Sequence, residues 1–413
     1  MNKKGFIKWQ IKESLPLYII AAIVLAAVFW IPSISNRLVP SLYFNDNNYT
    51  TSTMPTMVYY LVCFPPLFYI SIPAIIFACF LPISCFSHQT NHVRSDFFYQ
   101  IPMKEKELRN TKVLLNFAIL EIIYTIVYWV GILFIFVNQS SQNAIDPYFS
   151  ANPYFYNYIY FVPYFFLLMV EIALTYFTSS FLASLATRNK DCGFYIVFGQ
   201  LFLAFSFMAI LLFFIRCGSF NYLDSFSQFT ISFPNFSWLE SEFHTFIFSD
   251  LIYKVNYLGN NTNLPNSYNA IYIAARIFSS VCFLITGGLS AWGVLFKKDP
   301  SGEFAGKAGM GGKIASTIPH LTMGMIGLFV ACGVSTSYGT IGMYIFYILW
   351  GVLYYFSLVI VNGSFHFSKK KWITYLSVCG GVILLTIVMV VSSNIVSNIE
   401  AASSSSVQDT QLI

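Results

Sequence analysis

Long hydrophobic stretches recur along the whole chain, and shorter polar stretches separate them. A helix needs about 20 apolar residues to cross the hydrocarbon core of a membrane, and each stretch has roughly that length or more. The stretches cover residues 15–33, 58–83, 113–137, 158–185, 193–215, 270–296, 317–334, 339–362 and 373–392. This pattern predicts an all-α polytopic membrane protein with about nine transmembrane helices.

The basic residues lie almost entirely on one side of these predicted spans. If the chain starts in the cytoplasm and alternates, all 22 Lys and Arg residues fall on the inner side except Arg37, Arg216, Lys254 and Arg276. Cytoplasmic loops of membrane proteins carry such an excess of Lys and Arg. The distribution therefore predicts a multi-pass protein of the cell membrane, with its N-terminus inside and its C-terminus outside.

The composition excludes an ordinary soluble domain. The 413 residues are 57% hydrophobic and only 9% charged, whereas soluble domains contain about 25% charged residues. The net charge of +5 is spread over short inner loops that face an anionic lipid surface, so no nucleic-acid binding is predicted. The eight cysteines form no CxxC pair or His/Cys cluster with metal-ligand spacing, so neither zinc nor redox chemistry is predicted.

Four segments outside the spans have a recognisable character. Lysines alternate with apolar and aromatic residues in 1–14, which predicts an interfacial helix on the inner leaflet or a basic orientation signal alone. The long outer segment 216–269 is rich in aromatic residues and favours short re-entrant or interfacial helices over a plain loop. Residues 298–316 form an inner loop. Residues 393–413 contain no Lys or Arg and are expected to be a disordered outer tail.

Sequence motifs for enzyme chemistry are absent, so the chain is expected to be neither an enzyme nor the holder of a cofactor. The glycine-rich run Gly302–Lys313 has the wrong spacing for a phosphate-binding loop. Two carboxylates lie inside spans, Glu121 in the third and Glu171 in the fourth. An ionised carboxylate is costly in lipid, so both are expected to face the bundle interior. There they either form a polar path or proton site, or make hydrogen bonds between helices.

The inner loop 84–112 holds three consecutive aromatic residues in a charged segment. They are Phe97, Phe98 and Tyr99. Ser95 and Asp96 precede them and can cap a short helix that starts at Phe97, and Pro102 ends that helix. Aromatic side chains in a cytoplasmic loop are costly to expose unless they meet a partner or a lipid surface. The loop therefore predicts a docking element for another protein, or an interfacial helix that touches only lipid headgroups.

The run from Asp96 to Pro102, with the charged stretch up to Lys112, resembles the loop between the second and third spans of ABC-2-type transporter permeases. The resemblance implies that Asp96–Ile101 is the coupling helix, which docks on an ATP-binding subunit. It implies further that Pro102 ends this helix and that Lys112 opens the third span.

Other parts of the chain are similar to the same family. The segment 1–14 resembles its connecting helix, and the segment 216–269 lies where the family has re-entrant helices. Residues Phe296–Gly306 resemble a segment that follows the sixth span in permeases of low-GC Gram-positive bacteria, although two residues interrupt the pattern. They are Gly302 and Phe304. The resemblance implies a six-span permease core over residues 15–297, to which residues 317–392 add three spans.

The function expected from this resemblance is that of the membrane subunit of an ATP-driven exporter in a bacterial cell membrane. Two permease subunits, identical or related, would form the path, and separate ABC ATPase subunits would bind ATP and Mg²⁺. The aromatic outer segment and the scarcity of charge in the spans favour an amphipathic peptide or a lipid-like substrate. The alternatives are a secondary transporter that uses Glu121 or Glu171 as a proton site, and a membrane sensor or assembly protein without transport activity.

Overall fold

The computed structural model describes residues 3–35, 54–91, 94–96, 100–102, 104–143, 161–218, 266–296, 312–337 and 339–410. Within these ranges the chain is helical and contains no strand. The helices are α1 (Lys3–Ser35), α3 (Met54–Cys85), α4 (Ser87–Thr90), α6 (Glu105–Asn143), α8 (Phe161–Ala183), α9 (Asn189–Gly218), α13 (Asn266–Phe296), α14 (Gly312–Ser337), α15 (Gly339–Asn362) and α16 (Lys369–Thr410). Each predicted hydrophobic stretch overlaps one of the long helices.

Four helices in the described part of the chain are long and apolar enough to cross a membrane. These segments are Lys3–Ile34, Glu105–Ile135, Tyr344–Asn362 and Lys369–Val388. Large apolar side chains on them face outwards, among them Ile23 at 62%, Leu133 at 61% and Ile348 at 67% exposure. Such exposure is unfavourable in water and natural in lipid. The chain is therefore a helical membrane protein, and the total of nine spans stays a prediction.

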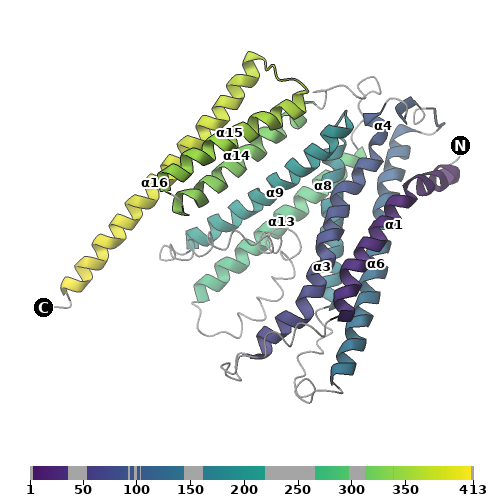
Figure 1. Ribbon diagram of the computed structural model, residues 1–413, viewed down its shortest axis with the longest axis horizontal. Helices are drawn as coiled ribbons and strands as arrows, with labels where there is room; N and C mark the ends of the chain where they lie inside the picture. Colours follow the sequence, from purple (N-terminus) through teal and green to yellow (C-terminus); the bar gives the residue numbers. More distant parts are fainter. Residues whose placement is uncertain are drawn as a thin grey trace.

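The helices form a bundle with a three-helix extension (Figure 1). Helices α1, α3, α6 and α8 pack side by side, and α9 and α13 pack against α8 at a tilt. The extension consists of α14, α15 and α16, which contact the rest mainly through α9. At that contact the Thr322 hydroxyl donates a hydrogen bond to the Phe198 carbonyl at 2.8 Å. Each part has its own apolar core, and the core of the extension is centred on Trp350 and Tyr354.

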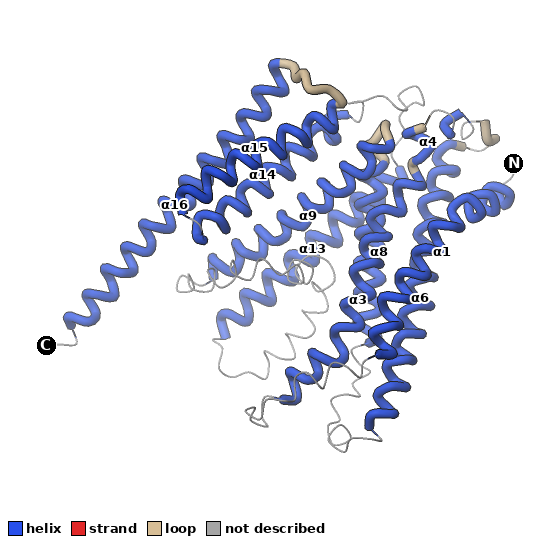
Figure 2. Tube along the Cα trace, in the orientation of Figure 1, coloured by secondary structure: helices blue, strands red, loops and turns tan. Residues whose placement is uncertain are grey.

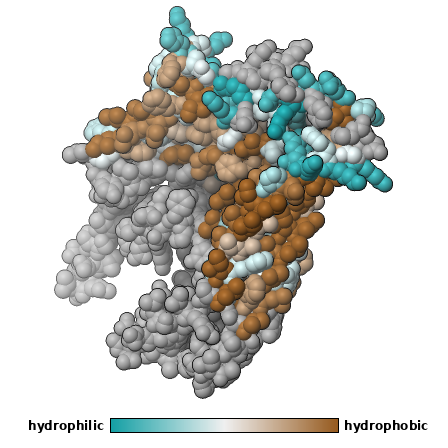
Figure 3. All heavy atoms as spheres, turned by 45° about the vertical axis from the view of Figure 1, so that its right-hand side comes forward, coloured by the Kyte–Doolittle hydropathy of each residue, from teal (hydrophilic) through white to brown (hydrophobic). Residues whose placement is uncertain are grey.

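The described loops lie together at one end of the molecule, where the N-terminus also lies (Figure 2). They include the connections from α3 to α6, from α8 to α9 and from α15 to α16, all of which the charge pattern predicts to be inner. Hydrophilic residues gather at this end, and hydrophobic residues cover the described surface below it (Figure 3). We call this end the loop end.

Two helices differ from the sequence-based expectation. The interfacial segment 1–14 is continuous with the first span, because α1 runs from Lys3 to Ser35 as one helix. Its first turns lie at an angle to the rest (Figure 1), and Pro16 lies inside the helix, where proline removes a backbone hydrogen bond and bends the axis.

The tail 393–413 is expected to be disordered, yet α16 continues to Thr410. Extending a formed helix costs far less than starting one, so a polar sequence can prolong it.

Other predicted segments lie largely outside the described residues. The structure describes the outer aromatic segment only at its two ends, at the end of α9 and the start of α13. It describes the inner loop 298–316 only from Gly312 onwards.

Glycines on α13 allow this helix to approach α8 closely. A Cβ atom at Gly287 would clash with the side chain of Leu174, and a Cβ at Gly293 would come within 2.9 Å of Phe181 Cε2. Gly288, the next residue along α13, has nothing within 4 Å of the corresponding position. Small residues at helix interfaces allow such close packing in membranes. The contact between α8 and α13 therefore depends on Gly287 but not on Gly288.

Replacing Gly287 by alanine is expected to lower the stability of the bundle by about 1–3 kcal/mol, the usual cost of overpacking. The matched variant Gly288→Ala should be neutral or slightly stabilising, because alanine favours a helix by about 1 kcal/mol over glycine. Thermal unfolding of both variants in detergent measures the difference. Equal stability of the two variants would contradict the close packing of α8 and α13.

Candidate functional site

The segment between α3 and α6, residues 86–104, forms the predicted coupling element at the loop end. Arg94, Ser95 and Asp96 have helical backbone, and the Gln100 amide donates a hydrogen bond to the Asp96 carbonyl at 3.2 Å. Helical structure thus begins at least three residues before Phe97, and Asp96 lies within it. The expectation that Ser95 and Asp96 cap a helix starting at Phe97 is therefore corrected, because both already have helical backbone. The predicted aromatic residues Phe97, Phe98 and Tyr99 lie outside the described residues.

One side of this segment packs against the first turns of α1. Ile101 is 7% exposed and shares a small apolar core with Phe6 and Leu108. An ion pair of 3.3 Å between Arg94 and Glu13 adds a second link to α1. Ile101, which the resemblance assigns to the docking surface, therefore points inwards and anchors the segment.

The other side of the segment is open. Asp96, Gln100 and Pro102 are exposed, whereas Ser95 is buried. A segment with one face fixed to α1 and α6 and another face exposed has the form of a docking element. Pro102 and Asp96 thus lie where a partner can reach them.

The start of α6 is bound to the end of α13. The Arg109 guanidinium and the Asn110 amide both donate hydrogen bonds of 3.3 Å to the Leu295 carbonyl. Lys106 Nζ lies 4.3 Å from the centre of the Phe296 ring. Lys112, predicted to open the third span, lies two turns inside α6 and is only 3% exposed. The helix therefore begins well before the hydrophobic stretch, and Lys112 is a buried residue of the bundle.

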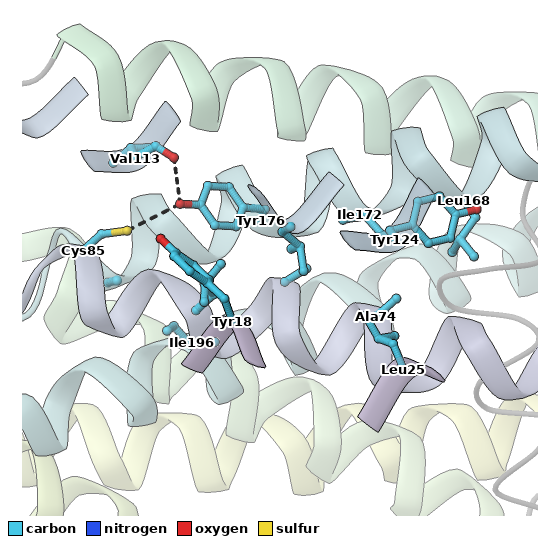
Figure 4. Packing of buried hydrophobic residues seen from close by; sticks show 14 of the residues in the cluster. Tyr18, Leu25, Ala74, Cys85, Val113, Tyr124, Leu168, Ile172, Tyr176 and Ile196 are labelled. Atoms are coloured by element: carbon cyan, nitrogen blue, oxygen red, sulfur yellow. Dashed lines mark hydrogen bonds between the residues drawn. The ribbon is translucent and has the colours of Figure 1, made fainter. Parts of the chain in front are cut away.

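A polar cluster lies directly behind the segment and joins four helices (Figure 4). Tyr18 of α1 donates a hydrogen bond to Asn116 Oδ1 of α6, and Asn116 Nδ2 donates to Cys85 Sγ of α3 at 2.7 Å. The Cys85 sulfur lies 3.4 Å from Tyr176 Oη of α8, which donates to the Val113 carbonyl at 2.9 Å. We call Tyr18, Cys85, Asn116 and Tyr176 the central polar cluster. Bonds of this kind fix the rotation of neighbouring helices, because a broken one leaves a buried polar group.

His88 connects the segment to this cluster. Its ring is 1% exposed, and Nδ1 lies 3.1 Å from the Cys85 carbonyl. Burial, with a smaller contribution from the nearby positive charge of Lys112, lowers the pKa of His88 from 6.5 to about 3. His88 is therefore neutral near pH 7, and the neutral ring can donate its Nδ1 hydrogen to the carbonyl.

Both predicted intramembrane carboxylates are buried in the bundle. Glu121 is 5% exposed and Glu171 is fully buried, and none of their four carboxyl oxygens has a hydrogen-bond partner among the described residues. Aromatic contacts of Phe117 with Tyr176, and of Tyr124 with Phe165, place α6 and α8 antiparallel. With this register the two carboxylates lie within about one helical turn of each other in depth. Burial without a partner disfavours the charged form of both.

The two carboxylates face different neighbouring helices. Glu121 lies between Phe117 and Tyr124 on the side of α6 that faces α8. Glu171 lies one turn before Thr175 on α8. One turn after Thr175, two hydroxyls of α8 accept hydrogen bonds from Gln200 of α9. Gln200 Nε2 donates hydrogen bonds of 2.9 Å to Thr178 Oγ1 and to Ser179 Oγ. The structure thus adds a polar contact between α8 and α9 near Glu171.

Sequence reasoning identified the carboxylates but missed the central polar cluster and Gln200. A signal was present in Asn116 and Gln200, which are amide residues inside hydrophobic stretches. Such residues must find partners in the bundle. The partners themselves depend on helix packing, because Tyr18 and Asn116 lie 98 positions apart.

No protein-family profile, curated protein or solved structure matches this chain.

Proposed function

We propose that this chain is the membrane-spanning permease subunit of an ATP-driven ABC exporter in a bacterial cell membrane. The observation that carries the proposal is the segment 86–104, which has an exposed face at the loop end and a face anchored by Ile101. In the ABC-2-type permeases that the sequence resembles, this position couples the membrane subunit to its ATPase. ATP and Mg²⁺ would bind to the partner ATPase, and this chain would have no catalytic site.

Contacts at the segment offer a path from an ATPase to the transmembrane helices. A push on the segment would act on α1 through Ile101 and through the ion pair between Arg94 and Glu13. It would act on α3 and α6 through His88, whose ring contacts the Cys85 carbonyl beside the central polar cluster. Because that cluster joins α1, α3, α6 and α8, the helices would move together. The driving free energy would come from the ATPase, which must bind one arrangement of the segment better than the other.

The complete transporter would contain two permease subunits, identical or related, and two ATPase subunits. The loop end would face the cytoplasm, as the distribution of Lys and Arg predicts. The substrate class that fits best is an amphipathic peptide or a lipid-like molecule, because the spans contain few charged residues.

Affinity purification of the tagged chain from its native membrane tests this proposal. We expect an ABC ATPase to co-purify in equal amount, and ATP hydrolysis to drive outward transport after reconstitution in lipid vesicles. The proposal would be contradicted if no ATPase co-purified, or if transport did not require ATP.

A second candidate function is a proton-coupled secondary transporter, and a specific observation favours it. Glu121 and Glu171 are buried at similar depth without hydrogen-bond partners among the described residues. Buried ionisable residues inside spans often form proton relays in transporters. In this alternative, transport would follow a proton gradient without ATP.

Replacing Glu171 by glutamine separates the two candidates. Under the exporter proposal we expect ATP-driven transport to stay within about twofold of wild type, because glutamine keeps the size of a neutral carboxyl. The control is Glu107→Gln, which removes an exposed carboxylate at the start of α6. Transport is measured in vesicles with ATP alone and with a proton gradient alone. A loss of gradient-driven transport in Glu171→Gln, but not in Glu107→Gln, would establish the secondary transporter instead.

A further inference from the structure

We propose that the groove between α15 and α16 binds one anionic phospholipid, with an acyl chain in the groove and the phosphate beside Lys369 and Lys370. This site is separate from the coupling segment and does not depend on the transport proposal.

The groove exists because α14 holds α15 and α16 together while their facing sides leave space. It has a volume of about 520 Å³, which lies in the range of small-molecule sites. Its lining is aromatic and aliphatic and includes Tyr347, Trp350, Tyr355, Trp372, Tyr375 and Ile383. Gly351 also lines it, and the Tyr375 hydroxyl donates a hydrogen bond of 2.9 Å to the Gly351 carbonyl. The shape is thus fixed by side chains that bind each other across the two helices.

The groove opens sideways, towards the hydrocarbon region of a membrane. Ile348 and Leu376 line it and are 67% and 60% exposed. Both belong to helices that are long and apolar enough to cross a membrane. An apolar groove with this opening accepts a hydrocarbon chain without the loss of any polar contact.

The length of the groove matches one leaflet. Its lining on α16 runs from Trp372 to Ile383. Eleven helical steps cover about 17 Å, which is close to half of the roughly 30 Å hydrocarbon core. Trp372 lies at the loop end of the groove. Tryptophan is favoured at the membrane–water interface, so this end of the groove fits the level of the lipid headgroups.

Charge at the mouth of the groove determines the headgroup. Lys369, Lys370 and Lys371 precede Trp372 directly, and all three are exposed. No Asp or Glu occurs between residues 304 and 399, so neither α15 nor the start of α16 supplies a counter-charge. Asp191, which lies near the end of α15, already binds Arg188 at 2.6 Å. Basic clusters beside transmembrane helices bind anionic headgroups for this reason.

The first test asks whether the lysines select an anionic headgroup. Native mass spectrometry of the purified chain measures its binding of a phosphatidylglycerol and of a phosphatidylcholine with the same acyl chains. We expect wild type to prefer phosphatidylglycerol. The variant Lys369→Gln with Lys370→Gln should lose about 10- to 30-fold in affinity for it, from about 1 kcal/mol for each lysine. The control Lys3→Gln with Lys4→Gln removes two exposed lysines from the N-terminal turns of α1, away from the groove, and should change affinity less than about twofold.

A pair of glycine variants tests the groove. Gly351→Leu places a side chain into the space and should weaken the binding of both lipids, whereas Gly380→Leu, at a position with nothing within 4 Å, should not. Glycerol phosphate should not displace the lipid, because it lacks acyl chains.

The proposal is overturned if both lysine pairs have the same effect, if Gly351→Leu binds as wild type, or if glycerol phosphate competes. It is also overturned if wild type shows no lipid preference, or if a second copy of the chain occupies this face.

Discussion

Under the exporter proposal, replacing Phe98 and Tyr99 together by alanine is expected to release the ATPase or to uncouple its hydrolysis from transport. These two aromatic residues lie in the segment 86–104, next to Asp96 and Gln100, which are exposed at the loop end. Buried aromatic anchors contribute about 2 kcal/mol or more each at a protein interface. The loss of two anchors should therefore abolish co-purification, which quantitative mass spectrometry of the purified complex measures.

A control for this double variant is available at the same end of the molecule. Phe365, in the connection between α15 and α16, is 64% exposed. Phe365→Ala should leave the ATPase bound, because this connection is not the predicted coupling element. Thermal unfolding shows whether the double variant still folds. A folded double variant with a fully coupled ATPase would remove the basis of the exporter proposal, and the proton-coupled transporter would then be favoured.

Acidification is expected to destabilise the protein through His88. Its pKa is about 3 in the folded protein, because of burial and the charge of Lys112, and 6.5 in the unfolded chain. Below pH 6.5 the unfolded chain therefore takes up a proton that the folded protein does not, so stability falls as the pH falls towards 3. The loss is about 1.4 kcal/mol for each pH unit, or about 2 kcal/mol at pH 5.

The variant His88→Asn isolates this effect from the titration of carboxylates. Asparagine can still donate a hydrogen bond to the Cys85 carbonyl, but it does not take up a proton in this range. Unfolding in detergent at pH 7.5 and pH 5 should show a smaller loss for His88→Asn than for wild type. The variant His366→Asn, at an exposed position, should behave as wild type. An identical pH dependence of His88→Asn and wild type would show that His88 is not held neutral by burial.

The sequence by itself determined the helical class of this protein and the location of its long helices. Apolar stretches of about 20 residues have few alternatives to a helix, because a membrane interior satisfies no backbone hydrogen bonds. The cost of a carboxylate in lipid also predicted that Glu121 and Glu171 face inwards, and both are buried. The clustering of loops at one end follows from the alternation of spans, and the Lys and Arg residues had identified those loops as a group.

Tertiary structure decided which residues meet. Hydrophobic stretches of this kind are apolar on nearly every side, so their sequence does not reveal how each helix is rotated about its axis. For this reason the pairing of Tyr18 with Asn116, and of Gln200 with Thr178, could not be predicted. The inward position of Ile101 was hidden for a related reason, because its partner Phe6 belongs to a helix far away in the sequence.

The groove between α15 and α16 is also a property of the packed helices alone. The sequence shows the lysines at 369–371 and the aromatic residues on both helices. The open space beside those lysines arises only when the two helices pack. The hydrogen bond from Tyr375 to the Gly351 carbonyl joins the helices there, and the side chains around it line the space. Hydrophobic stretches thus specify where helices form, and the side chains that interlock between them decide where a site can exist.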